Sequence, residues 1–128
     1  MHGKQRDRRR EERAGRVAEW MAIFYLALTG HRILARRWRG RAGEIDLVAQ
    51  RRGLLLFCEV KYRRDAADSG VPTARQRNRI CRAAQEFAAR RRPGRALEWR
   101  FDLIRVSLPG RASPLPLRHL KDAWRCDG

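Results

Sequence analysis

The chain has 128 residues, which suits one domain with a single hydrophobic core rather than two. No apolar run approaches the roughly 20 residues needed to cross a bilayer, and no signal-peptide pattern is present, so we expect a soluble cytoplasmic protein. The three cysteines have neither disulfide-framework nor zinc-site spacing and are expected to be free thiols. The formal net charge of +17 favours a polyanionic partner, most simply nucleic acid, although anionic membranes and ribosomal surfaces would attract it too.

Residues 1–14 are highly charged and lack hydrophobic periodicity, which predicts a solvated basic arm. This arm could be a disordered tail, or it could lengthen the first helix. Residues 15–128 are expected to form the single folded domain.

The first predicted helix covers about residues 15–29 and ends at Gly30, a natural C-cap. Its main apolar stripe at helical spacing consists of Val17, Met21, Phe24 and Leu28, with Tyr25 beside it. Ile23 and Leu26 lie on the opposite side, so the second half of the helix is predicted to pack on two sides. Glu19 lies near this second side.

Three strands are predicted next, over residues 31–38, 44–50 and 54–62, each bounded by glycine or basic turn residues. A meander is the simplest arrangement for them.

A second helix is predicted to begin near Ala74, because Thr73 and Gln76 have the spacing of a capping box. Pro93 ends it. The residues expected to face the core are Ile80, Ala83, Ala84, Phe87 and Ala88, while the arginines at 75, 77, 79 and 82 lie outside that stripe.

Residues 98–107 read as a fourth strand, and residues 117–124 as a short closing helix. The order helix, three strands, helix, strand predicts one α/β domain without internal repeats.

The charged residues Glu44, Asp46, Glu59 and Lys61 stand in segments that otherwise read as buried strands. Charges are rarely buried unless they are paired or bind a metal. Alternation places Glu59 and Lys61 on one face of their strand. With a two-residue turn at residues 52–53, Asp46 would lie opposite Glu59 and Glu44 opposite Lys61, whereas a longer turn would move the two carboxylates to different faces.

Two interpretations of these charges stay open on spacing alone. Facing carboxylates destabilise a sheet unless something lies between them, and Asp46 with Glu59 supplies the one or two carboxylates with which magnesium is usually held. The other interpretation is a ladder of salt bridges on an exposed sheet face. Leu55 and Phe57 share the face of Glu59 and Lys61, which indicates that this face is largely covered and argues against an exposed salt-bridge ladder.

The chain resembles the PD-(D/E)xK nuclease superfamily and, within it, the UPF0102 (YraN-like) family. The resemblance covers about residues 15–106 and rests on the segments GEIDLVA, FCEVKYR, TARQRNRI and RFDLI, with RHLKDAW as a further segment near the end. The family is similar to archaeal Holliday-junction resolvases. The resemblance therefore implies a restriction endonuclease-like fold, with a central mixed β-sheet flanked by helices.

Transferred position by position, the resemblance implies that Asp46 and Glu59 are metal ligands for Mg²⁺ or Mn²⁺. It implies that Lys61 is the catalytic lysine and that Glu19 is an additional acidic residue of the site. Ile45 stands where the superfamily name has proline, as it does throughout the family pattern. Gln76 falls where related nucleases can carry a lysine or glutamine. The residues expected to contact nucleic acid are Arg36, Arg37, Arg39, Arg41, Arg63, Arg75, Gln76 and Arg79.

Other polar and aromatic residues are expected to be structural. Glu44 is expected to pair with an arginine, and Asp102 to form an ion pair with a neighbouring arginine. His31 and His119 are read as isolated residues without a catalytic role. The tryptophans at 38, 99 and 124 are expected to pack in the core rather than to stack on bases.

The sequence thus predicts a metal-dependent, structure-selective endonuclease that acts on branched DNA, which as a resolvase could be a homodimer. The alternatives are a nucleic-acid-binding accessory protein of repair or recombination that does not cleave, and a protein associated with RNA or the ribosome.

Overall fold

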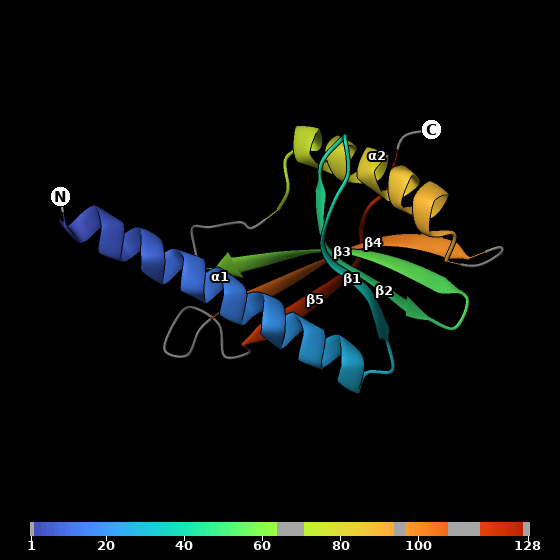
Figure 1. Cartoon of the computed structure of the whole chain (residues 1–128). Coiled ribbons are helices and arrows are strands. Elements are labelled where there is room, and N and C mark those ends of the chain that lie inside the picture. The colour runs from blue at the N-terminus through green and yellow to red at the C-terminus, as the bar shows by residue number, and fades with distance from the viewer. Residues whose placement is uncertain (1, 64–70, 94–96, 108–115, 127–128) are drawn as a thin grey trace.

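The computed structural model describes residues 2–63, 71–93, 97–107 and 116–126 (Figure 1). The elements follow in the order α1 (His2–Leu28), β1 (Arg32–Arg39), β2 (Glu44–Arg51), β3 (Leu54–Arg63), α2 (Ala74–Arg91), β4 (Glu98–Ser107) and β5 (Leu117–Trp124). Within these residues, neither helix has the length and apolar character needed to cross a membrane.

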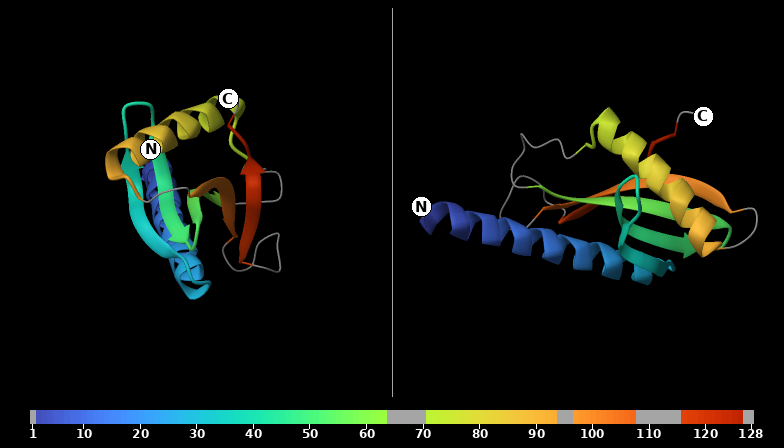
Figure 2. Two further views of the ribbon diagram at one scale, coloured as in Figure 1. Left: turned by 90° about the vertical axis from the view of Figure 1, so that its right-hand side faces the viewer. Right: turned by 45° about the horizontal axis from the view of Figure 1, so that its top comes forward.

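One five-stranded sheet runs in the order β1-β2-β3-β4-β5. The first three strands form the predicted antiparallel meander, β4 lies parallel to β3, and β5 is antiparallel to β4. The sheet is therefore mixed. Helix α1 runs along one face and α2 covers the other, which gives three layers (Figures 1 and 2). The fold class predicted from the sequence is confirmed.

The β2–β3 hairpin has the predicted two-residue turn. Its ladder pairs Arg51 with Leu54 and continues to Leu47 opposite Cys58. Arg52 adopts a φ of 54°, in the left-handed region that tight hairpin turns require, and Gly53 completes the turn. The turn chemistry therefore fixes the register on which the position of Asp46 depends.

Helix α2 begins and ends as its sequence predicts. The Thr73 hydroxyl accepts a hydrogen bond from the Gln76 amide at 3.2 Å, and the Gln76 side chain accepts one from the Thr73 amide at 2.9 Å. These two bonds make the predicted capping box. At the other end, Arg92 adopts a left-handed conformation and donates its amide to Ala88. The buried side is made by Ile80, Cys81, Ala83, Ala84 and Phe87.

Helix α1 is longer than the predicted helix, because the charged arm at its start is itself helical from His2. In Figure 1 these first turns extend beyond the edge of the sheet. The helix ends as predicted at Gly30, which has a φ of 88°. The amides of Gly30 and His31 donate to the carbonyls of Ala27 and Leu26, which is the Schellman pattern.

The face that α1 turns to the sheet differs from the predicted one. The residues buried there are Ala14, Ala18, Ala22 and Leu26. The predicted stripe is instead largely in solvent, with Val17, Phe24 and Leu28 exposed. Small alanine side chains at every fourth position let the helix backbone approach the sheet closely, so close packing decided the orientation rather than the number of large apolar residues.

The prediction of a helix at residues 117–124 was wrong, because this segment is strand β5. The apolar spacing of Leu117, Leu120 and Trp124 fits a helix, but the edge of β4 offers a partner for its backbone hydrogen bonds. A register shift opposite Phe101–Leu103 and a φ of 54° at Asp122 adjust the strand to that edge. Long-range pairing therefore overrode the local pattern.

The expectation of three free thiols was also wrong. Cys81 in α2 and Cys126 after β5 form a disulfide, which ties the closing strand to the helix above the sheet. Cys58 is free and buried, and burial raises its pKa well above the usual value. A buried neutral thiol of this kind is expected to be unreactive.

Two hydrophobic clusters lie on opposite faces of the sheet. The cluster under α2 includes Trp38, Phe57, Phe87, Phe101 and Trp124, whose rings pack against one another. The cluster under α1 is built from smaller side chains of α1, β2, β3 and β4. Of the three tryptophans expected in the core, Trp38 and Trp124 are buried, whereas Trp99 is 41% exposed.

Candidate active site

The sequence-predicted site forms where β2 and β3 separate. The hairpin ladder ends at Leu47 opposite Cys58, one residue before Asp46 would face Glu59. Beyond that point the Asp46 side chain, rather than the β2 backbone, accepts the Val60 amide at 2.8 Å. The Asp46 carboxylate is thus held by the backbone of the neighbouring strand.

The carboxyl groups of Asp46 and Glu59 are in direct contact. The hydrogen bond between their side chains raises the pKa of Glu59 and lowers that of Asp46. Lys61 Nζ lies 3.5 Å from Glu59 Oε1, as expected from their position on one face of β3. The structure therefore brings Asp46, Glu59 and Lys61 together as the sequence predicted.

The carboxyl groups of Asp46 and Glu59 both have raised pKa values. Burial, followed by the Asp46 charge, raises the pKa of Glu59 to about 8, with Lys61 opposing the shift. Burial also raises the pKa of Asp46, while the Val60 amide and the bond from Glu59 lower it. Two carboxyl groups this close in a half-buried place oppose each other's ionisation unless a cation lies between them. The pair therefore carries a proton at neutral pH unless a cation replaces it.

Glu19 faces the same site from α1. It lines a cleft of about 340 Å³ together with Asp46, and its charge is close enough to raise the pKa of Asp46. Both Glu19 oxygens accept from Arg37 Nε at 3.0 Å, and Arg36 Nε lies 3.8 Å from Oε1. The other residues lining the cleft are Glu12, Gly15, Arg16, Arg37, Val60 and Tyr62.

Glu12, Arg16 and Tyr62 were not identified from the sequence as part of the site. Glu12 and Glu19 are seven residues apart and so lie on one side of a continuous helix, with Arg16 between them. That signal is present in the sequence. It was missed because residues 1–14 were treated as an arm rather than as helix.

The residues predicted to contact nucleic acid fall into two groups. Arg36 and Arg37 lie beside Glu19 and the cleft. The second group lies around the β1–β2 loop and α2, where Gly43 packs against Arg79 and the Arg41 amide donates to Glu86 at 2.7 Å. Exposed members of this group are Arg39, Arg41, Arg75, Gln76 and Arg79. The side chain of Arg63 lies outside the described residues.

Two of these residues also have structural partners. Arg39 pairs with Glu44 at 3.5 Å, which confirms the predicted pairing of Glu44 with an arginine. The Gln76 side chain is held in the capping box.

The donor set at Asp46 and Glu59 suits a hard divalent cation. Among the described residues, no group of three or more acidic, histidine or cysteine side chains is placed to hold a metal ion by protein ligands alone. Magnesium, however, is commonly bound by one or two carboxylates, with waters and phosphate oxygens as the remaining ligands. The two half-buried carboxyl groups of Asp46 and Glu59, which contact each other, fit that pattern.

Asp102 in β4 is fully buried and has a different environment. Arg100 donates to it from Nε and Nη2, each at 2.9 Å, and the Asp122 amide donates at 2.9 Å. His119 Nε2 lies 2.5 Å from Asp102 Oδ2, and His119 Nδ1 lies 2.7 Å from the Tyr25 hydroxyl. The predicted ion pair with an arginine is confirmed, and His119 is not isolated. It links α1 to the sheet.

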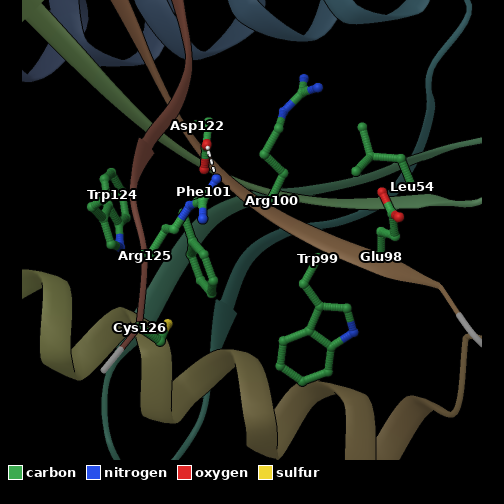
Figure 3. A pocket seen from close by; sticks show the side chains of 9 residues that line it. All are labelled: Leu54, Glu98, Trp99, Arg100, Phe101, Asp122, Trp124, Arg125 and Cys126. Carbon is green, nitrogen blue, oxygen red and sulfur yellow. Dashed lines mark hydrogen bonds and ion pairs between the residues drawn. The ribbon is translucent and has the colours of Figure 1, made fainter. Parts of the chain in front are cut away.

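A further cavity of the described residues lies away from the carboxylate pair. It measures about 520 Å³ and is lined at the first residues of β3 and β4 and the last of β5. In Figure 3 the side chains of Trp99, Phe101 and Trp124 surround it, and Arg125 contacts Asp122. The catalytic candidates are absent from its lining. We place the site at the smaller cleft, because Asp46 and Glu19 line it and Glu59 contacts Asp46.

Fold and site together define the class: an α/β protein whose five-stranded mixed sheet lies between two helices, consistent with a restriction endonuclease-like arrangement, with an acidic pair and a lysine on adjacent strands. Residues 18–106, more than half of the chain, match the model of the Uncharacterised protein family UPF0102. The chain belongs to this family.

Curated relatives agree with this assignment over most of their length. A UPF0102 protein of Maricaulis maris is 46% identical over 122 residues, which cover 93% of this chain and 91% of the relative. One of Agrobacterium fabrum is 41% identical over 95% of this chain and 97% of its own. One of Caulobacter vibrioides is 47% identical over 88% and 86%.

Proposed function

We propose that the protein is a metal-dependent endonuclease that hydrolyses phosphodiesters in branched DNA at the cleft beside Asp46, Glu59 and Lys61. The observation that carries this proposal is the half-buried pair of carboxyl groups of Asp46 and Glu59, which are in direct contact. Asp46 and Glu59 share a proton in a place where two carboxylates are costly, and Lys61 is the cation that contacts Glu59. A structural salt bridge would not need the second acid.

Asp46 and Glu59 would hold Mg²⁺ or Mn²⁺. When bound, such an ion lowers the pKa of a water and withdraws charge from the phosphoryl oxygens. The Val60 amide fixes the Asp46 carboxylate in position, so the ligand oxygens are ordered before substrate arrives.

Lys61 supplies the positive charge that the reaction needs on the protein side. Its ammonium group is partly exposed and lies 3.5 Å from Glu59. From this position it can donate to a phosphate oxygen and stabilise the negative charge that develops there. Arg16 and Arg37 line the cleft with Asp46 and can contact the phosphates on either side of the reacting one.

Cleavage of a labelled four-way junction, a flap, a single strand and a linear duplex with Mg²⁺ or Mn²⁺ tests the proposal. Asp46→Ala and Glu59→Ala should abolish cleavage while DNA binding remains. Lys61→Ala should slow it by about 10²- to 10³-fold. Glu44→Ala is the matched control, because this acid is in the same strand as Asp46 but pairs with Arg39 at the surface.

The alternative of a nucleic-acid-binding protein that does not cleave also has an observation in its favour. Arg37 donates to both oxygens of Glu19, an acid that lines the cleft together with Asp46. Tight junction binding by the wild-type protein, without cleavage in either metal, would select this alternative. Competition between the junction and a structured RNA of equal length would then test association with RNA or the ribosome.

A further inference from the structure

The side of α1 that faces solvent carries a continuous apolar stripe. It begins at Val17 and includes Trp20, Phe24 and Leu28, which are 49%, 66% and 84% exposed. Two of the four are large aromatic side chains on consecutive turns of the helix. The sheet needs none of them for its core, since α1 packs on it through alanines and Leu26. An apolar stripe of this kind marks a contact surface.

Trp20 is connected to the candidate active site through one arginine. The Arg36 guanidinium lies 4.8 Å from the centre of the Trp20 ring. Arg36 Nε also lies 3.8 Å from Glu19, which lines the carboxylate cleft with Asp46. The exposed indole therefore lies beside the cleft. Arg36 contacts both the indole and Glu19, which lines the cleft.

Charge selects the class of partner for this surface. Arg16 precedes Trp20 by one helical turn, Arg36 contacts the indole from β1, and Arg37 lies beside Arg36 on the neighbouring Glu19. A second copy of the chain would bring the same arginines and a further net charge of +17 against them. A polyanion would instead neutralise them. Among polyanions, nucleic acid also offers flat aromatic rings to an exposed indole.

Base pairing limits which nucleic acids can use an indole in this way. In a continuous duplex each base face is covered by its neighbours, and only base edges and phosphates are accessible. A single strand, a flap or a branch point presents unstacked bases whose faces can stack on tryptophan or phenylalanine. An aromatic stripe beside a phosphate-binding cleft thus favours substrates with unpaired nucleotides.

We propose that Trp20, with Phe24 one turn further along α1, stacks on an unpaired base of a strand whose phosphates pass Arg36 and Arg16. This inference rests on the proposed function for the placement of the strand in the cleft, and it names the feature that would select branched over linear DNA. The contact concerns binding and is independent of cleavage.

The test is fluorescence anisotropy in EDTA with a labelled single strand and a blunt duplex of the same sequence. Trp20→Ala and Trp20→Leu should weaken single-strand binding about tenfold and duplex binding less than about twofold, because each stacked base contributes that order of affinity. Trp20→Phe keeps an aromatic face and should retain most of the affinity. Leu28→Ala is the matched control on the same stripe and should bind both probes as the wild type does.

Equal losses on both probes, or no loss on the single strand, would overturn the inference. So would a wild-type dimer, seen by sedimentation, that Trp20→Ala dissociates, since the stripe would then be a self-association surface. Failure of the proposed function is distinguishable. If no metal supports cleavage but Trp20→Ala still weakens single-strand binding more than duplex binding, the endonuclease proposal fails and the base contact stands.

Discussion

Asp102 is a fully buried acid, whereas Asp46 and Glu59 on the neighbouring strands are half-buried, and the environments of the two sites are opposite. Asp102 is completely buried and accepts hydrogen bonds from Arg100 and the Asp122 amide, with His119 against the same carboxylate. Burial alone would raise its pKa, but these partners outweigh burial and lower it. Asp46 and Glu59 have one amide and one lysine, and their pKa values are raised.

This difference separates a structural acid from the pair that we propose to be catalytic. Asp102 is stabilised as an ion by the folded chain itself, so it needs nothing from outside. For Asp46 and Glu59, the state with both carboxyl groups ionised is stabilised only when a further cation is supplied. A perturbed acid pair in a cleft is a common feature of catalytic sites. The comparison therefore predicts that neutralising Asp102 and neutralising Glu59 change the unfolding free energy in opposite directions.

Neutralising Asp102 should have the largest effect on stability. Asp102→Asn leaves Arg100 partly buried without its anion and removes an acceptor from His119. Breaking a buried ion pair of this kind costs about 3 kcal/mol or more of unfolding free energy. Urea unfolding followed by circular dichroism measures the loss. A variant within about 1 kcal/mol of the wild type would show that the network does not stabilise the fold.

The same residue should make stability depend on acid pH. Because the pKa of Asp102 is lower in the folded state, the unfolded chain takes up the proton first as pH falls. Its stabilising contribution is therefore complete above the unfolded pKa of about 4 and is lost as pH falls through the lower folded value. The stability gap between wild type and Asp102→Asn should narrow over this window. A gap that stays constant would contradict the assigned pKa direction.

Neutralising Glu59 should have a smaller effect of opposite sign. Glu59→Gln keeps the shape of the side chain and can still donate a hydrogen bond to Asp46. It removes one of the two like charges that repel each other when both carboxyl groups are ionised. We expect the unfolding free energy at pH 8 to be unchanged or to rise by up to about 1 kcal/mol. Activity should be lost in the same variant. Destabilisation as large as that of Asp102→Asn would mean that Glu59 is structural.

The sequence predicted those features of the site that depend on local geometry. The turn at Arg52 fixed the register that brings Asp46 to Glu59, and alternation placed Lys61 beside Glu59. The capping box at Thr73 is equally local. Each needed only nearby residues and the period of a strand or the first turn of a helix.

Features that depend on distant partners could not be predicted in this way. The orientation of α1 is set by close packing of alanines on the sheet, and the aromatic stripe of Trp20 and Phe24 is exposed as a result. Strand β5 forms because β4 has a free edge. The Cys81–Cys126 disulfide joins residues that are 45 positions apart, and only the fold brings them together.

The most direct test of the central claim is thermal unfolding of the wild type, Asp46→Asn and Glu44→Gln, each with Mn²⁺ or with EDTA. A ligand that binds only the folded state raises the unfolding temperature. Our account predicts that Mn²⁺ raises the midpoint of the wild type and of Glu44→Gln but leaves Asp46→Asn unchanged. An equal rise in all three proteins, or none in the wild type, would contradict a cation site at the Asp46–Glu59 pair.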